Sequence, residues 1–141
     1  MVTFKLSARS REQLRGVHHD LVLVVSRGLL YSPHDFAVIE GLRAIERQRE
    51  LVSRGLSKTY ASKHLVQPDG YSHAVDIMAA GDLNNDGTVD HQDKLITWDR
   101  AVYGQIAEAM KRAAGELGIG VRWGGEYKTW YDGPHYELFS T

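Results

Sequence analysis

The stretch Ser72-His73-Ala74-Val75-Asp76-Ile77-Met78 contains a predicted strand and two of the candidate site residues, His73 and Asp76. We expect a strand over residues 74–78, and because alternate residues of a strand point to opposite faces, His73 and Asp76 point apart. These two side chains are therefore poorly placed to bind one ion together. His64, on the preceding irregular segment, is the better partner for Asp76.

Helical and strand patterns on both sides of this stretch predict an α+β fold with a small antiparallel sheet and flanking helices. Ser10 to Gln13 has the form of a capping box, and the apolar spacing after it predicts a first helix that runs to about Arg27. The other expected elements are helices over 44–53 and between the cap Asp99 and Gly118, and strands over 36–39, 121–123 and 136–139. Residues 57–71 are polar and irregular.

The composition is that of one ordinary globular domain, residues 1–141. Apolar residues make up 43% and charged residues 25%, which excludes a disordered or fibrous chain. Seventeen Lys and Arg against eighteen Asp and Glu leave a formal charge of -1, which argues against nucleic-acid binding. No apolar run is long enough to span a bilayer and no leader is present, so we expect synthesis in the cytosol without membrane insertion. We also expect a monomer.

The chain has no cysteine, so any metal site must use histidine and carboxylate ligands. These residues gather in two segments, Ser62–Asp76 and Tyr131–Glu137. A catalytic zinc needs three nitrogen or oxygen ligands, an open position for water and a nearby carboxylate to accept a proton. On the last predicted strand His135 and Glu137 share a face, and Asp132 can reach the same ion across the Gly-Pro turn.

The motifs resemble those of the zinc peptidases that include the D-Ala-D-Ala peptidases of vancomycin resistance and the phage endolysins that cleave L-alanyl-D-glutamate bonds. Their pattern is Ser-x-His, then Gly-x-Ala-x-Asp, and later an acidic residue three positions before a His. Here these elements are Ser62-Lys63-His64, Ser72-His73-Ala74-Val75-Asp76 and Asp132-Gly133-Pro134-His135. The resemblance spans about residues 36–138 and implies a hedgehog/DD-peptidase-like fold.

The resemblance implies that His64, Asp76 and His135 bind zinc and that Asp132 is the general base. An aspartate at position 132 is more similar to the endolysin branch, since the dipeptidase branch carries glutamate there.

Gly41-Leu42-Arg43 is similar to the family's Gly-x-Arg, whose arginine is placed to bind substrate and steady the tetrahedral intermediate. Gln48 falls where relatives often carry a glutamine that contacts substrate. This correspondence is weaker than that of Arg43. Gln48, His73 and Glu137 are candidates for a supporting or substrate-binding role.

The chain departs from the pattern between its first two motifs. Residues 67–71 look inserted, and Ser72 stands in place of the family's glycine. His73 therefore remains an alternative to His64 as the first zinc ligand. His18 and His19 fall on the first predicted helix, where we expect them on the surface.

Residues 82–93 match the calcium-binding loop of an EF-hand, which supplies oxygen ligands at fixed positions around a sharp glycine turn. Gly87 occupies the turn position. The expected calcium ligands are Asp82, Asn84, Asp86, Thr88, Asp90 and Asp93. The loop begins six residues after Asp76. We therefore expect that bound calcium orders the loop and stabilises the zinc site, which makes the activity calcium-dependent.

The sequence thus predicts a zinc-dependent peptidoglycan endopeptidase that cuts the peptide stem between L-Ala and D-Glu. We expect it to be made without a signal peptide in the host cytoplasm and released to the cell wall by a separate membrane-permeabilising partner. One alternative is a D-Ala-D-Ala carboxypeptidase or dipeptidase. Another is a metal-stabilised binding module without turnover.

Overall fold

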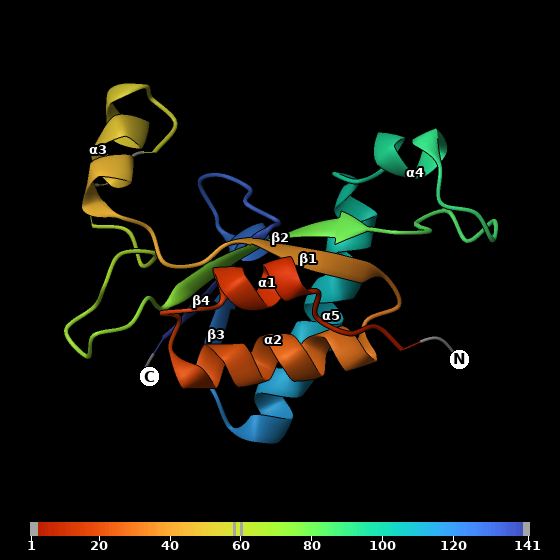
Figure 1. Ribbon diagram of the computed structural model, residues 1–141, viewed down its shortest axis with the longest axis horizontal. Coiled ribbons are helices and arrows are strands. Elements are labelled where there is room, and N and C mark those ends of the chain that lie inside the picture. The colour runs from red at the N-terminus through yellow and green to blue at the C-terminus, as the bar shows by residue number, and fades with distance from the viewer. Residues whose placement is uncertain (1–2, 58, 60, 140–141) are drawn as a thin grey trace.

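The computed structural model describes residues 3–57, 59 and 61–139, and it is built on a four-stranded antiparallel sheet with the strand order β1-β2-β4-β3 (Figure 1). This arrangement confirms the α+β prediction. The strands are β1 (Asp35–Glu40), β2 (Ala74–Ala80), β3 (Val121–Trp123) and β4 (His135–Leu138). The helices are α1 (Ala8–Gln13), α2 (His19–Tyr31), α3 (Ile45–Ser53), α4 (His91–Leu95) and α5 (Arg100–Leu117), with a 3-10 turn η1 (Gly124–Glu126).

The core lies between the sheet and the crossing helices α2 and α5, whereas α3 and α4 stand away from it at the top of Figure 1. Alternate residues of β2 point into this core, as the period of a strand requires. The side chains with at most 1% exposure include Leu21, Val24, Val25, Val75, Ile77, Ile106, Met110 and Tyr136. Asp76 points to the opposite face of β2, away from the helices.

The prediction of one continuous first helix was wrong. The backbone turns at Gly16, whose φ is 82°, and this turn separates α1 from α2. The predicted capping box at Ser10 was also wrong, because Ser7 is the N-cap of α1 and accepts the Ser10 N–H. Ser10 is buried instead, and its hydroxyl oxygen accepts the N–H of Val38 at 3.0 Å. Apolar spacing continued across Gly16, so periodicity alone could not reveal the break.

The register of the sheet places three ionisable residues in one row across neighbouring strands. Asp76 of β2 pairs with Glu40 of β1 on one side and with His135 of β4 on the other. A register shift between Val38 and Glu40 brings the last residue of β1 opposite Asp76. The carboxylate of Asp76 on the central strand therefore lies between Glu40 and His135 in this row.

The segment between α3 and β2 is attached to the body of the protein through Ser72. The Ser72 N–H donates to the Gly16 carbonyl at 2.8 Å, and the Ser72 carbonyl accepts the His18 N–H at 2.9 Å. The His73 N–H donates to the Lys63 carbonyl at 2.8 Å. These backbone contacts hold His64 at the edge of the sheet beside β1 and β2.

Gly41 is the residue through which β1 approaches α1. A Cβ atom at Gly41 would lie 2.2 Å from the Gln13 carbonyl oxygen and 2.8 Å from a methyl carbon of Val17. Only glycine allows this approach without movement of the backbone.

Gly41→Ala should therefore lower the free energy of unfolding by about 1–3 kcal/mol, since the extra methyl group overpacks a rigid contact. Gly115→Ala is the matched control, because a Cβ there meets nothing within 4 Å and alanine favours the interior of α5. Urea unfolding of both variants measures the difference. Equal stability of Gly41→Ala and the wild type would contradict the packing described for α1 and β1.

Candidate active site

Three side chains from separate segments converge on one face of the sheet. Asp76 belongs to β2, His135 to β4 and His64 to the segment between α3 and β2. Asp76 Oδ2 lies 3.3 Å from His64 Nε2, and Asp76 Oδ1 lies 3.1 Å from His135 Nδ1. Each residue offers one ligand atom, and these atoms lie within 4.8 Å of one another. Two imidazoles and one carboxylate are a donor set typical of zinc and similar divalent metals.

The hydrogen bond at the other side of the His64 ring determines which nitrogen is free. His64 Nδ1 lies 2.8 Å from the Gly41 carbonyl oxygen, and because a carbonyl only accepts, Nδ1 must carry the proton. In the neutral ring Nε2 then presents a lone pair. That atom is buried without a hydrogen-bond partner and faces the Asp76 carboxylate. Two electron-rich atoms that face each other in a buried site repel each other, and a cation bound between them would remove this repulsion.

His135 lies between two carboxylates. Its Nδ1 faces Asp76, and its Nε2 lies 2.8 Å from Glu137 Oε1, which also accepts the Tyr127 hydroxyl at 2.9 Å. Burial disfavours the charged ring, but the hydrogen bonds to Asp76 and Glu137 prevail and raise the pKa of His135 to about 9. Burial also opposes the charge on Asp76, but the hydrogen bond from His135 and the close approach of the His64 ring outweigh it and lower the pKa of that carboxyl.

Asp132 lines the same cleft from the loop that precedes β4. Its burial, followed by the nearby charge of Asp76, raises the pKa of its carboxyl above the ordinary range. The loop passes close to η1, where a Cβ at Gly124 would lie 2.2 Å from the Asp132 carbonyl oxygen. Glycine at position 124 thus permits Asp132 to reach the cleft, and the raised pKa strengthens this carboxylate as a base.

Arg43 is held rigidly at the edge of the cleft. Its Nε and one terminal nitrogen donate to the two oxygens of Glu40 at 2.6 and 2.8 Å, while the other terminal nitrogen donates to Gln48 Oε1 at 2.7 Å. The guanidinium also lies 3.9 Å from Asp76 Oδ2. Glu40 lies outside the sequence motifs, although its position three residues before Arg43 was a usable signal.

Gln48 is fully buried and supports Arg43 rather than facing substrate. Its side-chain nitrogen donates to Ser57 Oγ at 2.9 Å and to the Thr59 carbonyl at 2.6 Å. These contacts suit the supporting role expected for Gln48. It ties α3 and the following segment to Arg43.

The converging residues open into a cleft of about 560 Å³. Its wall includes two aromatic residues, Tyr127 and Trp130, whose ring centroids are 5.1 Å apart. Arg43 and Arg47 line the same cleft. Aromatic and cationic side chains thus line a cleft beside a possible metal-binding cluster, and both kinds can contact an extended peptide.

Comparison with known proteins agrees with this geometry. The family model for phage L-alanyl-D-glutamate peptidases matches residues 2–139. The chain belongs to this family. It is 28% identical over 151 residues to the L-alanyl-D-glutamate peptidase of Escherichia phage T5, a match that covers 97% of this chain and 99% of that protein. The crystal structure of the L-Ala D-Glu endopeptidase ChiX of Serratia marcescens superposes with a TM-score of 0.78 at 46% identity, over 96% of this chain and 90% of that one.

These findings confirm the family resemblance that the sequence motifs suggested. Within this L-alanyl-D-glutamate peptidase, His73 does not join the cluster of His64, Asp76 and His135. Its Nε2 lies 2.7 Å from Asp69 Oδ2, and His18 lies on the other side of the same carboxylate. His18 is half-buried and is the N-cap of α2, so its expected place within one long first helix was wrong.

The acidic loop of the peptidase, residues 82–93, curls upon itself. Asp82 accepts the N–H groups of Asp86 and Gly87 at 3.2 and 2.9 Å. Asp93 is buried and accepts the N–H groups of Leu83, Asn84 and Asp90, while Asp90 caps α4. Among residues 3–57, 59 and 61–139, the groups close enough to share an ion are His64 with Asp76 and His135, and His18 with Asp69 and His73. The acidic loop is not one of them.

No helix in the described part of the peptidase has both the length and the apolar character needed to cross a bilayer.

The raised pKa of His135 makes the stability of the metal-free peptidase depend on pH. A group whose pKa is about 9 in the folded protein and about 6.5 in the unfolded chain stabilises fully below pH 6.5, and this stabilisation is lost as pH rises through 9. In chelator, the free energy of unfolding should therefore fall by about 1 kcal/mol per pH unit across this window.

His135→Gln should flatten this dependence, whereas the exposed His91→Gln should leave it unchanged. Urea unfolding at several pH values measures both. A wild-type slope equal to that of His135→Gln would show that His135 is not held as a cation between its two carboxylates.

Proposed function

We propose that this chain is a zinc endopeptidase that cleaves the bond between L-Ala and D-Glu in the peptide stem of peptidoglycan. The observation that carries the proposal is the buried Nε2 of His64, which lacks a hydrogen-bond partner and faces Asp76 at 3.3 Å. His64, Asp76 and His135 would hold the zinc, since their donor atoms suit a three-ligand site with a remaining open position. The family and the printed activities of the two relatives support the substrate.

Glu137 would orient His135. Its Oε1 accepts from His135 Nε2, which leaves Nδ1 of that ring directed toward Asp76 and His64. A carboxylate behind a metal-binding imidazole determines its tautomer and raises its basicity. The Tyr127 hydroxyl in turn holds Glu137 Oε1 at 2.9 Å.

When bound, zinc would supply a Lewis acid for the scissile carbonyl and for a water molecule. Asp132 would accept the proton of that water and deliver it to the leaving amine. The raised pKa of Asp132 suits both steps, because a stronger base takes the proton more readily and the resulting acid can still return it.

Arg43 would bind the substrate and stabilise the negative charge that develops on the carbonyl oxygen. Glu40 and Gln48 hold three of its nitrogens, so the guanidinium is placed before substrate arrives. Such an arrangement lowers the entropy lost on binding. The cations Arg43 and Arg47 in the cleft also suit the carboxylate of a D-Glu residue.

Asp132→Asn should lower the rate of peptidoglycan digestion by about 10²–10⁴-fold, because the amide cannot accept the proton. Asp99→Asn is the matched control, since asparagine also serves as the N-cap of α5. Digestion of purified peptidoglycan is followed by mass spectrometry, and zinc content is measured in each variant.

The expected products are stems that have lost L-Ala, with zinc retained by Asp132→Asn. Release of terminal D-Ala would instead identify a D-Ala-D-Ala carboxypeptidase. Binding of peptidoglycan without any cleavage by the zinc-loaded wild type would identify a binding module.

We also propose that residues 82–93 bind calcium and that the ion supports the active site. The spacing of oxygen-bearing side chains from Asp82 to Asp93 favours a calcium loop, and Asp82 already turns its carboxylate toward the loop interior. This loop directly follows β2, the strand that carries Asp76. Calcium bound there would restrain the end of β2.

At constant free zinc, activity should rise with free calcium, and Asp82→Ala should lose this response while it keeps its zinc. Asp20→Asn, a substitution outside the loop, should retain the response. Activity is measured in calcium buffers on purified cell walls. A wild-type rate that is the same without calcium and in excess calcium would end this part of the proposal.

We propose that the enzyme is made in the host cytoplasm, acts as a monomer and reaches the peptidoglycan during host cell lysis through a separate membrane-permeabilising partner.

A further inference from the structure

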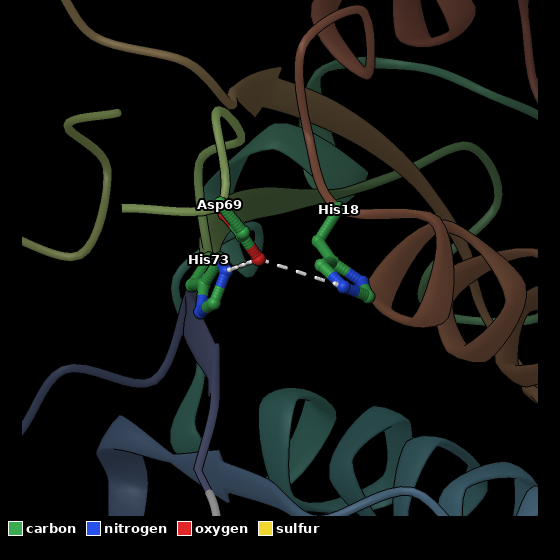
Figure 2. Close-up of side chains that lie close together, drawn as sticks. All are labelled: His18, Asp69 and His73. Carbon is green, nitrogen blue, oxygen red and sulfur yellow. Dashed lines mark hydrogen bonds and ion pairs between the residues drawn. The ribbon is translucent and has the colours of Figure 1, made fainter. Parts of the chain in front are cut away.

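A second cluster of metal-binding residue types lies on the helix side of the sheet, formed by His18, Asp69 and His73 (Figure 2). His73 Nε2 is 2.7 Å and His18 Nε2 is 3.7 Å from the same oxygen, Asp69 Oδ2. The planes of the His18 and His73 rings are nearly perpendicular, and the ring centroids are 5.2 Å apart. We propose that these three residues form a second divalent-metal site, separate from the active site, which takes zinc or a similar transition metal.

The geometry of the cluster is close to that of a bound ion. Ligands of a tetrahedral zinc lie about 2.0–2.1 Å from the metal, which places neighbouring ligand atoms about 3.3 Å apart. The separation between His18 and Asp69 is near this value, and that between His73 and Asp69 must open by a few tenths of an ångström. Two imidazole nitrogens and a carboxylate favour zinc, nickel, cobalt or copper over calcium and magnesium.

An ion can reach this cluster from solvent. The three side chains retain 23–40% of their exposure and line an open groove of about 510 Å³. Asp20 and Lys63 line the same groove, so their opposite charges offset each other beside the ion. Water in the groove can complete the coordination sphere.

The second site should bind zinc more weakly than the active site. His18 Nδ1 accepts the N–H of Asp20 and so caps α2, which leaves the proton of the neutral ring on Nε2. Metal at Nε2 moves this proton to Nδ1 and breaks the cap. His64 has no such conflict, because its Nδ1 already donates to the Gly41 carbonyl.

An ion in the second site would join three segments of the chain. His18 begins α2, Asp69 lies in the turn over residues 67–71, and His73 leads into β2. The N–H of His73 also donates to the carbonyl of Lys63, the residue before His64. Metal in the second site would therefore clamp the segment that carries an active-site ligand.

The test is a calorimetric zinc titration of the full, metal-free chain in saturating calcium, so that the acidic loop is occupied. The wild type should bind two equivalents, the second more weakly than the first. His18→Asn keeps a favourable N-cap residue and Asp69→Asn keeps the acceptor for the Tyr71 N–H, yet each should lose the second equivalent. Both should retain peptidase activity at one equivalent of zinc.

His19→Asn is the matched control, because His19 is exposed beside the cluster, and it should keep both equivalents. Asp76→Asn should lose the tighter equivalent and keep the weaker one, which separates this proposal from that for the active site. A single equivalent in the wild type would overturn the second site. So would a second equivalent that survives in either His18→Asn or Asp69→Asn.

Discussion

The hydrogen bond from His64 Nδ1 to the Gly41 carbonyl is the interaction on which the active site depends. It leaves the lone pair of Nε2 directed at Asp76, and this lone pair is the reason we propose that the cluster holds a cation. Gly41 can offer its carbonyl there because it has no side chain to collide with Gln13. One close backbone contact thus links the packing of α1 against β1 to the chemistry of the cleft.

The central strand β2 aligns further residues of the site across the sheet. Glu40, Asp76 and His135 lie in one row of three neighbouring strands, and each supports a different function. Glu40 holds Arg43, and Asp76 lies between the two imidazoles. His135 is held in turn by Glu137, which accepts a hydrogen bond from Tyr127. Carboxylates on both sides of His135 outweigh the cost of burying its charge.

Much of the site could be predicted from sequence, because short motifs carry it. The three motifs named His64, Asp76 and His135, and the structure brings these residues together. The row formed by Glu40, Asp76 and His135 could not be found in this way, since it depends on an irregular register between β1 and β2. The contact of His18 with Asp69 was also hidden, because it requires the break at Gly16 that regular apolar spacing concealed.

The most direct test is a crystal structure of the zinc-loaded chain with anomalous diffraction at the zinc edge. The account predicts a strong peak about 2.0–2.2 Å from His64 Nε2, an Asp76 oxygen and His135 Nδ1, with His135 Nε2 still bonded to Glu137. The absence of an ion among these three residues would contradict it. So would an ion bound through His64 Nδ1 with the Gly41 hydrogen bond broken.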